Sequence, residues 1–475
     1  MSAAVRYQLF GQPPTASASP RKISMIVISC AHSSALRAAA VLLPLAFGGC
    51  DAGAGSPAPI ASASDLGLFT DVVKQVEKNY VEPVPGTELV KDALKGMLSR
   101  LDPHSDYMDQ EQYQQMTSVT RGQFGGIGVE LTLEAKIPEV IAPIDGTPAA
   151  DAGVEPGDRI IKIDAQPTTG MDVEEIVKRL RGAAGTKVTL TIARSERAPF
   201  DLTLTRAVIR VISVKSDLKA DNIGYARVTT FTEATPVELA AAIIRLKERA
   251  HGRLNGLILD LRNDPGGLLD AAVEVAGQFI DGGVVVTTRG RNGADDRVYR
   301  APATGDLVRG TPIAVLINSA SASAAEIVAG ALQDHHRATV MGTRSFGKGS
   351  VQTIIPLDGR GALRLTTALY YTPSGRSIQG QGIAPDIVVN LPKNQQVANA
   401  VATHESDLYR ALKNTGSLNP SPVKGQAAEP PAGAEDLSEH PIKPLIIGTS
   451  NDAQLAAAFD YLQKAVRREA GAHHG

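Results

Sequence analysis

The chain has 475 residues and is poor in cysteine and in aromatic side chains. Its two cysteines, Cys30 and Cys50, both lie in the first fifty residues, so residues 51–475 contain neither a disulfide nor a cysteine-based zinc site. The nine histidines show no metal-ligand spacing, and we expect no bound metal. Tryptophan is absent and aromatic residues make up 4% of the chain, which disfavours the stacking surfaces that bind single-stranded nucleic acid.

An excess of charge of either sign is also missing. Lys and Arg number 48 and Asp and Glu number 50, so the formal net charge is −2. This balance gives no overall basic character of the kind that marks nucleic-acid-binding domains, so we expect no nucleic-acid partner, with a local basic patch as the alternative. Apolar residues at 43% with charged residues at 21% predict a folded chain, long enough for about three domains.

Long apolar runs are scarce as well. The run over residues 38–47 is shorter than the ~20 residues that cross a bilayer, and it has the length of a signal-peptide core. Small residues before Cys50 and the polar stretch after it resemble a bacterial lipoprotein processing site. We therefore expect residues 1–50 to be an export segment with lipidation at Cys50, and residues 51–64 to be a flexible tether. This predicts a periplasmic protein that meets the membrane only through a lipid anchor; plain secretion or an unprocessed tail is the alternative.

Residues 65–117 are predicted to form an N-terminal helical domain. Apolar residues recur at intervals of three and four in two stretches, which Pro83 and Pro85 separate. A helix pair of this kind buries its apolar faces against another surface, and a second copy of the chain is one candidate for that surface.

Residues 118–208 are predicted to form short strands and turns around one helix. "TKVTLTIAR" and "FDLTLTRA" alternate with period two, and Asp172 followed by Glu175 is typical of a helix start. Together with "FGGIG" and "TPAADAGVEPGD", this segment resembles a PDZ domain over its whole length. The resemblance implies that a peptide adds a strand to the domain while backbone N–H groups hold its C-terminal carboxylate. The residues expected to hold this carboxylate are Gly125, Gly126, Ile127 and Gly128; a turn without a ligand is the alternative.

Residues 209–390 alternate apolar strands with helices. "NGLILDL" and "TPIAVLIN" have the pattern of buried strands, whereas "GGLLDAAVEVAGQFI" and "SAAEIVAGALQD" have the pattern of amphipathic helices. This order predicts an α/β layer fold. Residues 391–475 are predicted to be a Pro-rich linker and one C-terminal helix, whose apolar stripe docks on another domain.

Candidate catalytic residues gather between residues 318 and 352. Ser321 and Ser323 lie where a strand gives way to a helix, and the free N–H groups of a helix N-terminus stabilise an oxyanion. Capping of the helix explains one of these serines without any catalytic role. His335 and His336 lie at the far end of the same helix, about 18 Å away, so neither is a suitable base. The next strand, "ATVMG", returns the chain toward the start of the helix, and Lys348 follows it.

A lysine acts as a base only when its pKa falls from ~10.4 toward neutrality, which apolar surroundings favour. Gln352 is predicted to lie four residues further along a strand, on the same face as Lys348, where it would orient the amine. A solvated loop lysine is the alternative interpretation of Lys348.

Two other motifs overlap this region. "GTRSFGK" nearly matches a phosphate-binding loop, but Gly349 stands where that loop needs a hydroxyl, and a strand pattern follows instead of a helix. Ser345 and Lys348 form the S-x-x-K spacing of penicillin-binding enzymes, a motif that belongs on a helix, which the neighbouring glycines disfavour. We reject both interpretations.

"SASAAEIVAGALQD" followed by "GTRSFGKGSVQ" resembles the catalytic region of bacterial carboxyl-terminal processing proteases. "LDLRNDPGG", "YYTPSGRSIQGQGIAPDIVV" and "LDPHSDYM" match the same family, and with the PDZ segment the resemblance covers residues 65–390. It implies an α+β multidomain fold: an N-terminal helical segment, a PDZ domain, and an α/β protease core of the crotonase/ClpP-like type. It further implies a serine endopeptidase with Ser323 as nucleophile, Lys348 as general base and Gln352 as supporting residue.

The resemblance also implies how the reaction runs. The Ala324 N–H and the N–H of Gly266 or Gly267 would bind the oxyanion, and Lys348 would serve both steps of an acyl-enzyme mechanism without metal or organic cofactor. Substrates would be proteins or peptides with exposed apolar C-termini. An activating adaptor lipoprotein is a further candidate partner, and the N-terminal helices and the C-terminal helix are candidate surfaces for a homo-oligomer. Arg181 is a candidate gating contact of the PDZ domain, with a solvated helix-end arginine as the alternative.

Two other classes of function stay open at this point. The chain fits a PDZ-based adaptor or chaperone whose protease fold is idle, although the complete set of Ser323, Lys348 and Gln352 disfavours this. A different enzyme on the crotonase-like fold would need a coenzyme A site, for which the sequence shows no feature.

Overall fold

The structure is a computed structural model in which part of the chain is described. The described residues are 62–134, 137–195, 197–291, 293, 296–303, 305–391, 404–414, 416, 447–448 and 451–472. The predicted export segment and Cys50 lie outside these residues. No helix in the described part of the chain is long and apolar enough to cross a membrane.

Two helices begin the described part. They are α1 (Ala63–Asn79) and α2 (Gly86–Leu98). As predicted, Pro83 and Pro85 lie between the two helices. Helix α1 has no buried residue, so its apolar side chains, among them Leu68 and Val72, stay exposed. The chain divides into compact units at residue 67, within this helix.

A short strand and a third helix follow. These are β1 (Asp106–Met108) and α3 (Gln110–Thr120). The Asp109 carboxylate accepts a hydrogen bond from the Gln112 N–H, while the Gln112 side chain accepts one from the Asp109 N–H. This reciprocal capping satisfies two backbone donors and fixes the start of α3.

The segment predicted to be a PDZ domain forms a twisted antiparallel sheet with two helices. Its strands run in the order β3 (Val129–Glu134), β4 (Ile137–Pro143), β5 (Arg159–Ile163), β7 (Lys187–Ala193) and β8 (Phe200–Thr205), with β6 (Gln166–Pro167) paired to β5. The helices are α4 (Pro148–Asp151) and α5 (Val173–Leu180). As predicted, Asp172 caps α5, because its carboxylate accepts from the Glu175 N–H at 2.8 Å. Alternate strand residues, such as Ile160 and Leu190, are fully buried in one apolar cluster.

Strands β2 (Gln123–Gly126) and β9 (Ala207–Arg210) form a separate antiparallel pair. They lie at the two ends of the PDZ sequence, so the chain enters and leaves this domain along one ribbon.

The second large domain is an α/β core. Its sheet has the order β10 (Val214–Leu218), β11 (Ile223–Val228), β12 (Gly256–Asp260), β15 (Ile313–Ile317), β16 (Thr339–Gly342) and β19 (Ile387–Val388), and all neighbours after the first pair are parallel. Every residue of β12 and β15 is buried, which explains why these strands appear in the sequence as continuous apolar runs. The crossovers are α6 (Thr235–Arg249), α7 (Leu269–Gly277) and α8 (Ala324–Asp334).

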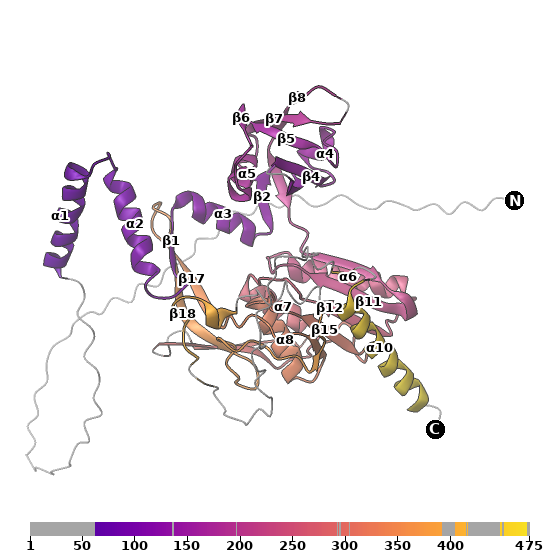
Figure 1. The fold of residues 1–475 in the computed structure, drawn as a ribbon. Coiled ribbons are helices and arrows are strands. Elements are labelled where there is room, and N and C mark those ends of the chain that lie inside the picture. The colour runs from indigo at the N-terminus through magenta and orange to yellow at the C-terminus, as the bar shows by residue number, and fades with distance from the viewer. Residues whose placement is uncertain are drawn as a thin grey trace, which may run out of the picture. The chain divides into compact units, whose positions relative to one another are not determined.

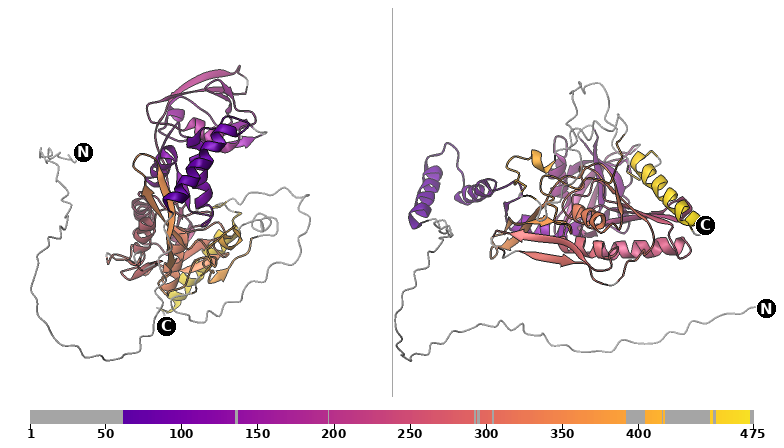
Figure 2. Two further views of the ribbon diagram at one scale, coloured as in Figure 1. Left: turned by 90° about the vertical axis from the view of Figure 1, so that its left-hand side faces the viewer. Right: turned by 90° about the horizontal axis from the view of Figure 1, so that it is seen from below.

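The two faces of this sheet are covered differently (Figures 1 and 2). Helices α6, α7 and α8 contribute to the large apolar cluster on one face, which includes Leu239, Val275 and Val328. The other face is covered by α10 (Ala453–Ala472), whose Leu455 and Leu462 pack against strand residues in a smaller cluster. The predicted C-terminal helix is thus present and docked, and the predicted α+β multidomain fold class is confirmed.

A buried ion-pair network fixes the start of α10. The Arg262 guanidinium follows β12, is fully buried, and donates to the carboxylates of Asp260 and Asp452 at 2.6 Å and 2.7 Å. Burial favours the neutral form of Asp452, but the hydrogen bonds and charge of Arg262 hold its pKa below the usual value. The Asp452 carboxylate also accepts from the Leu455 N–H, so one side chain both caps α10 and ties it to the sheet.

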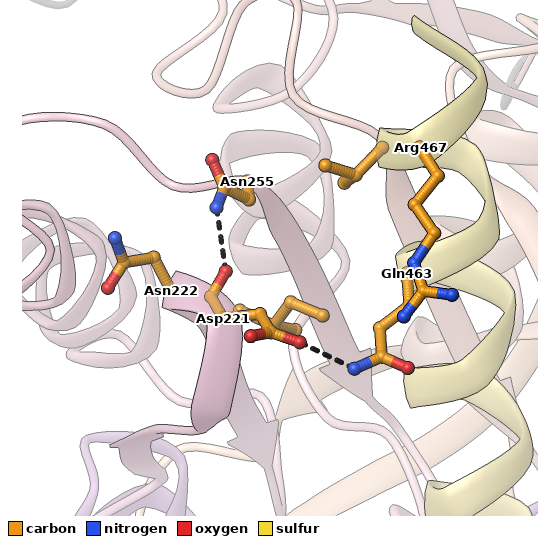
Figure 3. A pocket seen from close by; sticks show the side chains of 7 residues that line it. Asp221, Asn222, Asn255, Gln463 and Arg467 are labelled. Carbon is orange, nitrogen blue, oxygen red and sulfur yellow. Dashed lines mark hydrogen bonds between the residues drawn. The ribbon is translucent and has the colours of Figure 1, made fainter. Parts of the chain in front are cut away.

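Further along α10, the helix borders a small hollow (Figure 3). Gln463 donates to the Asp221 carboxylate, and Asn255 donates to the Asp221 carbonyl oxygen at 2.8 Å. None of the predicted catalytic residues lines this hollow, and we interpret its polar contacts as part of the docking of α10.

A second sheet packs beside the core. Its strands run in the order β1, β18 (Ala362–Tyr371), β13 (Val284–Gly290) and β14 (Arg297–Arg300), and β17 (Ser350–Pro356) pairs with β18. The pairing of β1 with β18 brings the "LDPHSDYM" segment of the N-terminal region next to the end of the protease sequence.

Candidate active site

Three loops meet at the carboxyl edge of the core sheet. They follow the parallel neighbours β12, β15 and β16, and carboxyl ends of parallel strands lie on one edge of a sheet. Backbone hydrogen bonds join the loops: Ala322 N–H donates to the Asp264 carbonyl at 2.9 Å, and Phe346 N–H donates to the Ser321 carbonyl at 3.0 Å. The predicted residues Gly266, Ser323 and Lys348 therefore come from loops that hold one another.

Ser323 lies in a strained turn between β15 and α8. Its φ is 54° and its ψ is −112°, a region that a residue with a side chain rarely adopts. Such a conformation costs on the order of 1–3 kcal/mol and persists only where the surroundings enforce it. Its hydroxyl is nearly buried and lies 3.0 Å from the Tyr370 hydroxyl on β18.

The structure separates the two candidate serines. The Ser321 hydroxyl is fully buried, donates to the Leu261 carbonyl at 2.8 Å, and accepts from the Asn318 N–H at 3.0 Å. Ser321 therefore ties the β15 loop to the β12 loop. The Ser323 hydroxyl, by contrast, lies within hydrogen-bond distance of the Tyr370 hydroxyl and makes no bond of this kind to the β12 loop among the described residues.

Glu326 organises both catalytic loops from the first turn of α8. It is completely buried, and its carboxylate accepts from the Ser323 N–H at 2.8 Å and from the Ser345 hydroxyl at 2.5 Å. It also accepts from the N–H groups of Gly347 and Lys348, at 2.7 and 2.9 Å. Burial raises the pKa of Glu326 to about 7, although these four donors oppose the rise.

Lys348 lies in the turn between β16 and β17. Its side chain is half-buried, and loss of hydration lowers the pKa of its amine, with the nearby charge of Glu405 opposing. Among the described residues, the amine has no carboxylate within ion-pair distance and no hydrogen bond to the Ser323 hydroxyl. A lysine in these surroundings is a candidate base, because burial shifts the pKa of its amine downward and no described carboxylate forms an ion pair with it.

The prediction that Gln352 lies on the same strand face as Lys348 is wrong. Strand β17 begins only at Ser350 and has a bulge between Val351 and Gln352, so the two side chains do not share one face of a regular strand. Gln352 donates instead to the hydroxyls of Ser350 and Thr366, at 2.9 and 3.2 Å. The turn departs from strand geometry because Glu326 holds the N–H groups of residues 347 and 348.

The candidate oxyanion donors have different surroundings. The Gly266 N–H donates to the Asp264 carboxylate at 2.8 Å and is therefore occupied. In the described part of the chain, the N–H groups of Ala324 and Gly267 have no acceptor. Gly266 still borders the nucleophile, because a Cβ at this position would lie 2.8 Å from the Cβ of Ser323.

The residues expected to bind a peptide carboxylate lie at the start of the PDZ domain. Gly125 and Gly126 belong to β2, Ile127 is buried in the apolar core, and Gly128 has a φ of 78°. The following strand, β3, is at the end of its sheet, so within the described residues its outer edge has no partner strand. This edge has the form that a peptide extends by strand addition. Arg181, the candidate gating residue, stacks on the Phe124 ring at 4.7 Å, and its role stays a prediction.

The rejected motifs are also disfavoured by the structure. The phosphate-loop-like sequence lies between two strands, β16 and β17, with no helix after it. Ser345 is not on a helix, and its hydroxyl donates to Glu326. His335 bonds to the Val284 carbonyl at the far end of α8. The described residues contain no cluster of side chains able to hold a metal ion.

Sequence reasoning missed several residues of the site. Tyr370 carries no signal beyond an alternating strand, and Glu326 belongs to a matched motif that gave it no role. Asp102 and His104 belong to the "LDPHSDYM" match, which indicated no function for them. Glu405 lies in a region interpreted as a linker, and no local pattern marks it.

A PDZ domain joined to an α/β core, with a strained serine at a strand–helix junction, defines a class of PDZ-containing serine hydrolases. The profile of peptidase family S41 matches residues 222–389, that of a PDZ domain matches residues 139–194, and that of the activating protease CtpB N-terminal domain matches residues 56–112.

Two named relatives agree with these matches. A carboxy-terminal-processing protease of Bartonella bacilliformis is 49% identical over 374 residues, which cover 78% of this chain and 85% of that protein. The carboxy-terminal processing protease CtpA of Bacillus subtilis is 37% identical over 321 residues, covering 67% of this chain and 68% of that protein. The solved structure of a photosystem II D1 C-terminal processing protease is 27% identical in sequence, with a TM-score of 0.40. That match covers 74% of this chain and 100% of the solved chain.

The chain belongs to the carboxy-terminal processing peptidases of family S41, and it is a serine protease with a PDZ domain.

Proposed function

We propose that this chain is an exported endopeptidase that holds the C-terminus of its substrate on the PDZ domain and cleaves with Ser323 and Lys348 through an acyl-enzyme. One observation carries the proposal: Glu326 binds the N–H groups of both residues, so one buried carboxylate fixes the strained serine and the half-buried lysine together. Gln352 is proposed to support the base through the hydroxyls of Ser350 and Thr366, with which it bonds.

The first half of the reaction forms the acyl-enzyme. The neutral Lys348 amine takes the Ser323 proton as the oxygen bonds to the scissile carbonyl carbon. In the free protein the Ser323 hydroxyl contacts the Tyr370 hydroxyl and not the Lys348 amine. Catalytic hydrogen bonds often form only when substrate binds, and we propose that substrate brings the Ser323 hydroxyl within reach of the amine. The lysinium then protonates the leaving nitrogen while the C–N bond breaks.

The second half regenerates the enzyme. Lys348 takes a proton from water as the water oxygen bonds to the acyl carbon, and it returns that proton to Ser323 as the ester bond breaks. The Ala324 N–H and the Gly267 N–H are the proposed oxyanion donors, because the Gly266 N–H already binds Asp264. No metal or organic cofactor takes part in these steps.

Recognition of the substrate is proposed to use the free edge of β3. The peptide would add a strand there, with its terminal carboxylate at Gly125, Gly126, Ile127 and Gly128, and exposed apolar C-termini are the preferred class. Arg181 would transmit occupancy of the PDZ domain to the protease core.

Export and assembly belong to the same proposal. The apolar run over residues 38–47 and the small residues before Cys50 support a periplasmic protein anchored by a lipid on Cys50. The exposed apolar side chains of α1 support a homo-oligomer, and an adaptor lipoprotein is a further proposed partner.

The test compares purified wild-type chain with Ser323→Ala and Lys348→Ala. Each is mixed with a loosely folded protein that has an apolar C-terminus, and fragments are identified by mass spectrometry. Cleavage by the wild type alone, slowed when the substrate C-terminus is amidated, supports the proposal. Equal cleavage by all three proteins would rule out this catalytic pair. Peptide binding without cleavage by any of them would favour the adaptor function instead.

A further inference from the structure

A short segment near the C-terminus lies against the catalytic lysine. Residues 404–414, here called the C-terminal strap, begin with a short 3-10 helix, η2 (Glu405–Asp407). Glu405 is fully buried, and its N–H donates to the carbonyl of Phe346, two residues before Lys348. Its carboxylate accepts from the Gln379 side chain at 3.0 Å, and Gln379 in turn accepts from the Gly349 N–H at 3.0 Å. The strap therefore holds the lysine turn on both sides of Lys348.

The other side of Glu405 meets the N-terminal region. The His104 ring nitrogen lies 2.9 Å from both carboxylate oxygens of Glu405. The backbone N–H of His104 donates to the Asp102 carboxylate at 2.8 Å, and this carboxylate also accepts from the Ser105 and Thr366 hydroxyls. The same Thr366 hydroxyl accepts from Gln352, so this polar network continues from the strap to the residue proposed to support the base.

We propose that Glu405 is a positioning residue of the protease reaction: it fixes the lysine turn and contributes a buried carboxylate to the charges that surround the Lys348 amine. This inference rests on the proposed role of Lys348 as general base. Glu405 does not touch the reacting atoms; it acts through the turn and through its charge.

The charges around Lys348 come from four separate elements. Burial is the main cause that lowers the pKa of the amine; Arg364 on β18 lowers it further. Three carboxylates raise it: Glu405 on the strap, Glu326 on α8, and Asp102 before β1. Glu405 is the largest of these charge effects, so its removal should leave the amine neutral at a lower pH.

The first experiment measures kcat/KM against pH for the full chain, because the acid limb of this profile reports the groups that must be deprotonated in the free enzyme. Glu405→Gln keeps the shape and loses the charge, and we expect its acid limb to move to lower pH. Arg364→Gln should move the limb to higher pH. Asp407→Asn is the matched control, because Asp407 is an exposed carboxylate of the same strap. A limb that stays in place for Glu405→Gln, or moves to higher pH, overturns the inference.

The second experiment measures the amine without using activity. In the Ser323→Ala background, the rate at which a small neutral reagent acylates Lys348 is followed against pH by peptide mass spectrometry. We expect Glu405→Gln to lower the midpoint of this curve and Asp407→Asn to leave it unchanged. If the wild-type chain cleaves nothing, a shifted midpoint would support the charge effect of Glu405 and count against the proposed function. An unshifted midpoint in an active protease would do the reverse.

Geometry and charge can be separated with a third variant. Glu405→Ala removes both the charge and the hydrogen bonds to His104 and Gln379. We expect Glu405→Ala to lower kcat by about 10- to 100-fold more than Glu405→Gln does. Displacement of the Lys348 amine from the reacting atoms slows the reaction far more than a change of the charge beside it. Equal rates for the two variants would contradict the positioning role.

Discussion

Gly266 offers the sharpest test of the nucleophile loop. An alanine Cβ at this position would lie 2.7 Å from the Ala322 carbonyl oxygen, 2.8 Å from the Ser323 Cβ and 2.9 Å from the Ala324 nitrogen. All three atoms belong to the loop that carries the nucleophile, and none is the far end of a flexible side chain. Gly266→Ala therefore cannot be accommodated unless this loop or its own loop moves by several tenths of an ångström.

The expected magnitude follows from what that movement displaces. The Ala324 N–H is a proposed oxyanion donor, and loss of one such donor costs about 10²- to 10³-fold in kcat, or about 3–4 kcal/mol. We expect Gly266→Ala to lower kcat by about 100-fold. KM for a substrate with an apolar C-terminus should change by less than about threefold, because the substitution leaves the PDZ contacts untouched.

Backbone strain alone has to be separated from this collision. Gly266 has a φ of 97°, whereas Gly252, in the turn after α6, has a φ of 100° and no neighbouring atom within 4 Å of the place where a Cβ would lie. Gly252→Ala should therefore cost about 1 kcal/mol of unfolding free energy, as any alanine with positive φ does, and leave kcat within about twofold. Both variants are assayed by urea unfolding and by initial rates. Equal kcat values for the two would refute the reasoning that places Gly266 against the nucleophile.

Three further outcomes are expected. Tyr370→Phe removes one neutral hydrogen bond to Ser323, worth about 1 kcal/mol, so kcat/KM in a peptide assay should change by less than about tenfold. Asp452→Ala leaves the buried Arg262 short of a partner and should lower the urea unfolding free energy by about 3–5 kcal/mol; a loss below about 1 kcal/mol would contradict its buried role. Glu326 has a pKa of about 7 against an ordinary 4.5, so the folded state holds an extra proton between these values. The unfolding free energy of the wild type should therefore fall by about 3 kcal/mol as pH rises from 4.5 to 7. Unfolding curves of Glu326→Gln at about pH 5 and pH 8 should not show this loss.

Features set by neighbouring residues could be predicted from the sequence. The run of apolar strand, serine and helix placed Ser323 at a helix N-terminus, and the length of β16 returned Lys348 to the same edge of the sheet. Both inferences need only the rise per residue and the rule that parallel strands end together. The capping of α5 by Asp172 was predictable for the same reason.

Features set by distant contacts could not be predicted. Two serines stood at the junction, and residue spacing by itself did not separate them; the tertiary bond from Ser321 to Leu261 shows that Ser321 has a structural role. Gln352 was expected to share a strand face with Lys348, but Glu326 holds the turn out of strand geometry, a contact that no spacing in the sequence signals. Glu405 reaches the site from a region with the composition of a linker.

The lysine turn itself explains why such distant residues matter. It lies between β16 and β17 and contains two glycines, so neither helix nor strand pairing fixes Lys348. Its geometry depends on Glu326 from within the core and on Glu405 from the strap. Glu326 also binds the nucleophile and contributes to a buried α8, whereas no residue of the strap belongs to the large apolar cluster that stabilises the core sheet. Substitution of Glu405 should therefore reduce turnover while the core stays folded, whereas breaking the Arg262–Asp452 pair should reduce stability first.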